Sequence, residues 1–191
     1  MPQFPLGVIR PCRVEWAVLH AAGKGGGPVM YVLSVLLLTL VFPSASVWFD
    51  LQQHPGAAAL PALIAQWFVF WAAGARLFLA GLRQLAQPRF TSRDIFGIAS
   101  DDALPIVREL GVANLATGTV GLLSHWRHDF VLPVALVAAI FYGLAGIRHL
   151  FQPHRTFNEN VALVSDLFLG ALFALWIGLT VAANFGIDVV L

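Results

Sequence analysis

The chain has 191 residues, of which 59% are hydrophobic and only 11% are charged, and its formal net charge is +1. Soluble domains carry about 25% charged residues, so a soluble protein of this composition would expose too much apolar surface. Because acidic and basic residues nearly cancel, no basic field favours nucleic acid as a partner. The single cysteine, Cys12, excludes an internal disulfide and a CxxC motif. The composition therefore predicts an integral membrane protein.

The first 28 residues form a basic segment ahead of the apolar ones. They include Arg10, Arg13 and Lys24 and end in a glycine-rich stretch. A cytoplasmic N-terminal tail is the simpler interpretation of residues 1–28, and a short helix over 12–22 on the membrane surface is the alternative.

Five long apolar segments follow and make up one predicted transmembrane domain, residues 29–191. Because a helix rises about 1.5 Å per residue, about 20 apolar residues cross the hydrocarbon core of a bilayer. The expected membrane-spanning helices are 29–48, 57–86, 104–124, 130–151 and 161–187. The first helix also has features of a signal peptide, with a cleavage site at 44–46. An uncleaved helix is favoured, because the basic region before it is long for a signal peptide.

Several residues mark where these helices begin and end. Asp101 or Asp102 can cap the third helix, and Asn158 can cap the fifth. Pro88 and Pro153 follow the second and fourth helices, where helices usually stop.

Lysine and arginine residues are concentrated on one side of the expected helices. Eight lie in the N-terminal tail and in the connections 83–103 and 148–160, whereas the other side has only Arg127. Since positively charged loops stay in the cytoplasm, the N-terminus is expected in the cytoplasm and the C-terminus outside a bacterial inner membrane.

One stretch of the sequence occurs twice. Residues 79–91, LAGLRQLAQPRFT, and residues 144–156, LAGIRHLFQPHRT, are 65 positions apart and identical at eight of thirteen positions. Each copy ends an apolar helix and precedes another, which predicts a duplicated helical hairpin. Both hairpins run the same way, so an axis along the membrane normal would relate them. The predicted fold is all-α: a four-helix bundle of two hairpins, plus the first helix packed outside it.

Polar and ionisable side chains cluster in one half of the expected bundle. The residues singled out as a candidate ligand-binding site are Arg76, Arg83, Glu109, Asn114, His149 and Asp166. Ionisable groups are costly inside a bilayer, so each needs a partner or a purpose. Arg76 and Arg83 are seven residues apart and share a helix face. The pattern predicts an enclosed polar pocket that opens toward the cytoplasm.

Two other interpretations of these charges stay open. Arg83 with Glu109 and Arg148 with Asp166 could form two ion-pair latches that only fix the hairpins, and an ion or proton path is also possible. Arg76 favours a pocket, because the corresponding position of the second copy is Phe141. The acids and His149 sit on three helices with no close ligand motif, so neither a metal nor another cofactor is expected.

The third helix carries a recognisable pattern. Residues 108–124, RELGVANLATGTVGLLS, place an acid before Gly-x-Ala-Asn and spaced glycines, and Gly146, His149 and Asp166 follow downstream. In this the chain resembles a family of small uncharacterised bacterial and archaeal membrane proteins, over roughly residues 57–180. In layout it is also distantly similar to DoxX-like four-helix membrane proteins. The resemblance implies a fold and marks residues 109, 111, 114, 149 and 166, and it implies no activity.

The leading functional hypothesis is a pocket for a lipid, a quinone or an organic acid. Arg76 and Arg83 would attract the ligand. Glu109 and Asp166 would orient these arginines or exchange protons. Asn114 and His149 would supply directional hydrogen bonds. Besides membrane lipids, the expected partners are such a ligand and a membrane-complex partner or a second copy of the chain. The alternatives are a structural or assembly subunit of a membrane complex and an intramembrane enzyme of isomerase or oxidoreductase type.

Overall fold

The computed structural model describes residues 27–56 and 59–185. The predicted N-terminal tail lies almost entirely outside the described residues.

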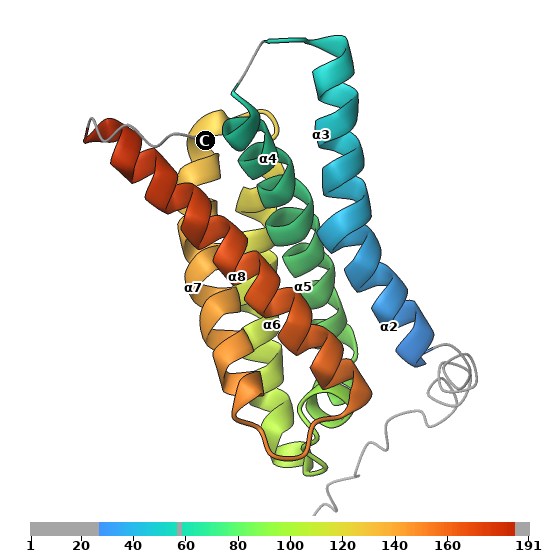
Figure 1. Ribbon diagram of the computed structural model, residues 1–191. Helices are drawn as coiled ribbons and strands as arrows, with labels where there is room; N and C mark the ends of the chain where they lie inside the picture. The colour runs from blue at the N-terminus through green and yellow to red at the C-terminus, as the bar shows by residue number, and fades with distance from the viewer. Residues whose placement is uncertain (1–26, 57–58, 186–191) are drawn as a thin grey trace, which may run out of the picture.

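Five helices in the described part of the chain are long and apolar enough to cross a membrane (Figure 1). The first consists of α2 (Gly27–Leu36), the π-helical segment η1 (Leu37–Val41) and α3 (Phe42–Gln53). The second consists of α4 (Leu60–Phe68), the π-helical segment η2 (Val69–Ala75) and α5 (Arg76–Ala86). The others are α6 (Leu104–Leu123), α7 (Val131–Leu150) and α8 (Phe157–Asn184), and short segments in the connections are η3 (Phe90–Ile95), η4 (Asp101–Ala103) and η5 (His128–Phe130). The all-α class and the five spanning helices predicted from the sequence are confirmed.

The capping residues of two helices differ from the prediction. Thr156, rather than Asn158, caps α8, because its side chain accepts a hydrogen bond from the backbone N–H of Glu159. The helix therefore begins at Phe157 instead of residue 161, and Glu159 lies on the same helix as Asp166. At the other connection Ser100 caps η4, which leads into α6, since its hydroxyl accepts from the backbone N–H of Asp102; α6 itself begins at Leu104, as predicted, without a side-chain cap.

Within each hairpin, glycines lie where its two helices pack against each other. α5 packs on α6, and α7 packs on α8. A Cβ added to Gly81 would lie 2.6 Å from the backbone nitrogen of Leu115, and one added to Gly121 would lie 2.6 Å from the Cα of Gly74. These distances leave no room for a side chain, so glycine is what lets the helix backbones approach this closely in lipid.

The core lies where the two hairpins meet. Ala72 of η2, Ala135 and Ala138 of α7, and Leu169 of α8 are fully buried there. The π-helical turn of η2 changes the backbone hydrogen-bonding pattern inside the membrane, and the Tyr142 hydroxyl donates to the carbonyl of Ala72 at 2.7 Å. A partner of this kind is what irregular backbone needs in hydrocarbon.

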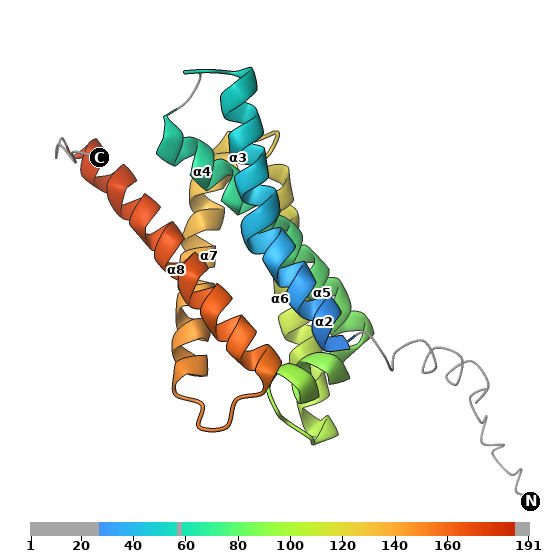
Figure 2. The ribbon, with the colours of Figure 1, turned by 45° about the vertical axis from the view of Figure 1, so that its right-hand side comes forward.

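The first spanning helix lies along the outside of the bundle, and its two ends are held differently. Figure 2 shows α2 and α3 crossing in front of α5 and α6, while α8 runs diagonally away from α3. At the α3 end, Trp67 donates to Asp50 and Trp71 donates to Ser46, both at 3.0 Å. Among the described residues, α2 has no side-chain hydrogen bond to another helix.

Candidate intramembrane binding cavity

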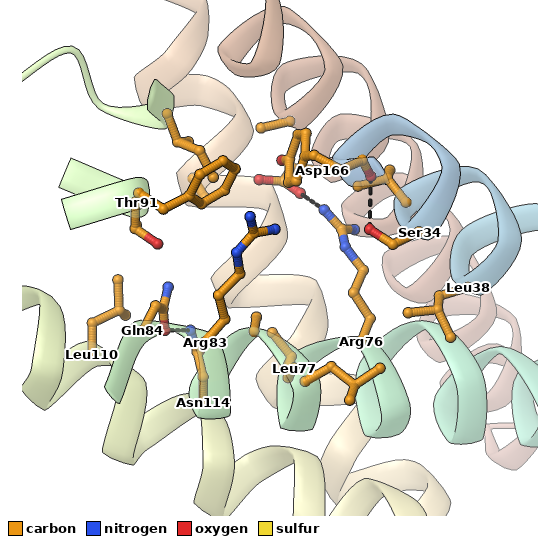
Figure 3. A pocket seen from close by; sticks show the side chains of 18 of the residues that line it. Ser34, Leu38, Arg76, Leu77, Arg83, Gln84, Thr91, Leu110, Asn114 and Asp166 are labelled. Carbon is orange, nitrogen blue, oxygen red and sulfur yellow. Dashed lines mark hydrogen bonds and ion pairs between the residues drawn. The ribbon is translucent and has the colours of Figure 1, made fainter. Parts of the chain in front are cut away.

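A cavity of about 400 Å³ lies inside the half of the bundle that holds the charged residues. α2, α5, α7 and α8 form its walls, and η3 and α6 close the rim (Figure 3). The described side chains with polar atoms on its wall are Tyr31, Ser34, Arg76, Arg83, Gln84, Thr91, Asn114, Tyr142, His149 and Asp166. The remaining lining is apolar, so a small number of polar groups faces a mostly hydrophobic space. That combination is typical of small-molecule sites.

Helical spacing brings the α5 residues into the cavity. Ala80 comes four residues after Arg76, and Arg83 and Gln84 come three and four residues after Ala80; all four line the cavity. Such residues share one face of a helix. At about 1.5 Å per residue, Arg76 lies about 15 Å along the axis from Ala86, well inside the membrane-spanning segment.

Arg76 joins the two hairpins through a buried ion pair. Its Nη2 atom lies 2.8 Å from Oδ1 of Asp166 and donates to the hydroxyl of Ser165 at 3.0 Å. Its guanidinium carbon lies 4.9 Å from the ring centroid of Tyr142. Only 12% of the Arg76 side chain and 8% of that of Asp166 are exposed, so each charge depends on the other for compensation. The Arg76 charge is therefore largely neutralised within the protein.

Arg83 is held in another way. Its guanidinium carbon lies 3.5 Å from the ring centroid of Phe90, in the connection that follows α5. Among the described residues, no carboxylate lies within ion-pair distance of it. Figure 3 shows Arg76 and Arg83 rising from the same side of α5, with Asp166 bonded to Arg76 and not to Arg83. Because the side chain is half-buried and lines the cavity, its positive charge faces this space.

In each hairpin, one hydrogen bond ties the two helices together at the rim of the cavity. Asn114 of α6 donates to Oε1 of Gln84 at 2.9 Å, and both side chains are buried. On the other side, Nδ1 of His149 lies 2.9 Å from Oε1 of Glu159. When Glu159 is ionised its carboxylate can only accept, and the imidazole then donates this bond. The second carboxylate oxygen of Glu159 is buried with no hydrogen-bond partner among the described residues.

The structure brings five of the six candidate residues to one cavity. Arg76, Arg83, Asn114, His149 and Asp166 all line it. Glu109 does not, because its side chain is exposed on another face of α6.

Neither of the ion-pair latches considered from the sequence forms among the described residues. Arg83 contacts the ring of Phe90 instead of Glu109, and Arg148 lies 5.4 Å from the ring centroid of Phe96. Asp166 pairs with Arg76 from the other hairpin, so the ion pair links the hairpins to each other.

Sequence reasoning missed several polar residues of this region. Tyr31 and Ser34 were overlooked because the first helix was expected outside the bundle with no part in the site. Glu159 was overlooked because α8 was expected to begin at residue 161. The sequence does hold a signal for it: Thr156 and Glu159 have the spacing of a capping box, Thr-x-x-Glu, which marks a helix start.

The arrangement is suited to holding an anion beside an apolar body. Arg83 offers charge-assisted hydrogen bonds, and the amides and hydroxyls around it offer neutral ones. No group of three or more metal-ligating side chains occurs in the part of the chain that the structure describes. His149 lines the cavity and is bonded to a second buried acid, which is an arrangement that can also relay protons.

Comparison with known proteins identifies one family. The model of a family of unknown function, DUF6790, matches residues 29–184. No curated protein and no solved structure matches the chain. The expectation of an uncharacterised family is thereby confirmed, and the match covers all five spanning helices except the first two residues of α2.

Proposed function

The chain belongs to the DUF6790 family, whose function is unknown, and we propose from its geometry that it is a multi-pass membrane protein whose cavity binds a small anionic or amphipathic ligand. The distribution of lysine and arginine supports a cavity on the cytoplasmic side of a bacterial inner membrane. The likeness in layout to DoxX-like proteins remains a prediction on which nothing in this proposal depends.

The observation that carries the proposal is the state of Arg83. A cation inside a membrane protein is normally paired with an acid or placed in water. Arg83 lies on the wall of a mostly apolar cavity, and its contact among the described residues is an aromatic ring. An anionic group in the cavity would supply the missing compensation.

The neighbouring residues have complementary roles in this proposal. The Arg76–Asp166 pair fixes the floor of the cavity and prevents Asp166 from neutralising Arg83. Gln84 and Asn114 are fixed by their mutual hydrogen bond, so their remaining polar atoms are held in place at the rim. Preorganised polar groups of this kind reduce the entropy lost when a ligand binds.

A structural role is the second candidate, and the Arg76–Asp166 pair favours it. This pair joins α5 to α8 whether or not a ligand is present. A structural subunit of a larger complex would need such a latch, yet it would have no use for the charge of Arg83, which no carboxylate of the described residues pairs with. An intramembrane enzyme remains a third possibility, for which the His149–Glu159 pair supplies a group able to exchange protons.

Two arginines at corresponding positions test the proposal. Arg83 and Arg148 are 65 residues apart, both sit near an aromatic ring of the same connection, and only Arg83 lines the cavity. We expect small anionic molecules to co-purify with the wild-type protein and with Arg148→Gln, and to be lost from Arg83→Gln. Mass spectrometry of the organic extract of each purified protein measures this. Equal recovery of the same molecules from all three proteins would support the structural role instead.

A further inference from the structure

We infer that the ligand is a single-chain amphipathic anion, a fatty-acid-like molecule that enters from the surrounding bilayer leaflet beside α2. This inference rests on the proposed function and names the chemical class of its ligand and the route of access. It is carried by the distribution of polar and apolar side chains in the cavity, by the single arginine that the described residues leave without a carboxylate partner there, and by the uneven attachment of the first helix.

The cavity has a polar end and an apolar wall. Arg83, Gln84 and Thr91 are grouped at the end nearest η3. Along α2, η1 and the facing part of α5, apolar side chains such as Val35, Leu38 and Leu77 line the wall beside Ser34 and the guanidinium of Arg76, whose charge Asp166 compensates. A ligand that fits both has a compact polar head and a hydrocarbon body.

The charge count selects a head with one negative charge. Of the two guanidinium groups in the cavity, Arg76 is compensated by Asp166, which leaves Arg83 as the cation without a paired carboxylate among the described residues. Asp94 of η3 also attracts Arg83 electrostatically, but its side chain is exposed and forms no ion pair with Arg83. A compact di- or triacid would bring further carboxylates against apolar walls, where burying an unpaired charge is costly. A monoanion avoids this penalty.

The volume suits part of a single chain. A cavity of about 400 Å³ holds a head group with part of one acyl chain. The rest of a long chain would leave the cavity between helices.

The first helix provides that passage, because only its α3 end is fastened. Asp50 and Ser46 accept hydrogen bonds from tryptophans of the second helix, whereas α2 packs on α8 without such bonds among the described residues. Between the two ends, the π-helical segment η1 is followed by Pro43, which has no N–H to donate. A helix is easily bent at such a point. Movement of α2 about this segment would open the wall formed by Tyr31, Ser34 and Val35 directly to lipid.

Spin-labelled stearic acid tests the ligand class in nanodiscs of phosphatidylcholine. We expect an immobilised component in the electron paramagnetic resonance spectrum that oleate displaces and that oleyl alcohol does not. Affinity should fall about tenfold or more in Arg83→Gln, since a hydrogen bond to a charged group is lost, and should be unchanged in Arg148→Gln. The same nanodiscs are titrated with succinate by calorimetry as a probe for a short, water-soluble acid.

The outcomes separate the inference from the proposed function. If succinate binds in an Arg83-dependent way and stearate does not, the proposed function stands and the amphipathic ligand is wrong. If the methyl ester of the labelled stearate binds as well as the acid, the role of the charge is wrong. If neither probe binds, both the inference and the proposed function are rejected.

A clamp across the wall tests the route. In a Cys12→Ser background, Tyr31→Cys and Phe90→Cys are joined with a bifunctional thiol reagent, since these two rings lie 5.9 Å apart. We expect exchange of bound spin label with the bilayer to slow at least tenfold relative to the same protein before crosslinking. The matched control joins Ser46→Cys to Trp71→Cys, which replaces one of the two hydrogen bonds at the α3 end with a covalent link while the Trp67–Asp50 bond stays, and should leave exchange unchanged. An unchanged rate in the Tyr31–Phe90 clamp would reject access beside α2.

Discussion

The two hairpins of the bundle carry different side chains at matching positions. Gln84 and His149 are 65 residues apart in the sequence, and each bonds to the following helix of its own hairpin, to Asn114 and Glu159 respectively. One hairpin uses two neutral amides for this connection and the other uses an imidazole and an acid. The shared position supports hairpin geometry, and the difference in chemistry shows that the hairpins are not interchangeable at the cavity.

The same contrast applies to the charges. Arg76 has Phe141 at the matching position, and the second helix is interrupted by η2 just before Arg76, whereas α7 is a regular α-helix. The two matching arginines also differ, because Arg83 lines the cavity and Arg148 is exposed outside it. The hairpin of α5 and α6 thus supplies the cations, and the hairpin of α7 and α8 supplies the acid that fixes one of them.

The largest effect on stability is expected from breaking the Arg76–Asp166 ion pair, which links the two hairpins. Asp166→Leu leaves the buried guanidinium of Arg76 without a counter-charge, which should lower the free energy of unfolding by about 3–5 kcal/mol. Equilibrium unfolding in mixed micelles measures this. The double variant Arg76→Met/Asp166→Leu should recover most of the loss, since no charge is then left unpaired. Asp129→Asn, in the exposed Arg127–Asp129 pair, should leave stability unchanged. A small effect of Asp166→Leu would mean that the pair does not hold the hairpins together.

A smaller effect on stability is expected from replacing Gly81 or Gly146, which occupy matching positions in the two hairpins. Gly81→Ala would place a methyl group 2.6 Å from the backbone of Leu115, and α5 and α6 must move apart to accept it. We expect a loss of about 1–3 kcal/mol. Gly146→Ala meets the end of the Leu167 side chain first, at 2.7 Å, so a rotamer change relieves part of the clash and the loss should be smaller. Unfolding measurements on both variants, with Gly178→Ala as the unhindered control, would sharpen or remove this ranking.

The rim hydrogen bonds give a third comparison. Gln84→Leu leaves the buried amide of Asn114 without this partner and should cost about 1–3 kcal/mol. His149→Leu should cost more, because it strands Glu159, whose second carboxylate oxygen already lacks a partner among the described residues. Unfolding of the two variants under the same conditions ranks them. A larger loss from Gln84→Leu would show that Glu159 is compensated by some other group.

The fold could be predicted because apolar length alone identifies helices that cross a bilayer. The site could be predicted in part, since seven-residue spacing places Arg76 and Arg83 on one face. The pairing of Arg76 with Asp166 could not, because it depends on how the second hairpin packs against the first and on the register change at η2. The wall formed by α2 was missed for a similar reason: Tyr31 and Ser34 carry no charge, and only their packing shows that they face the cavity.

The smallest effect on stability is expected where the effect on binding is largest. Arg83→Gln removes no ion pair among the described residues and loses only its contact with Phe90, so the free energy of unfolding without ligand should fall by less than about 1 kcal/mol. Arg148→Gln should behave the same way, because its contact with Phe96 is longer and exposed. The two variants then differ only when an amphipathic anion such as oleate is added: it should raise the unfolding midpoint of Arg148→Gln and the wild type, and leave Arg83→Gln unshifted. If Arg83→Gln alone unfolded the apo protein, Arg83 would be part of the scaffold, and the two hairpins would differ in stability instead of in binding.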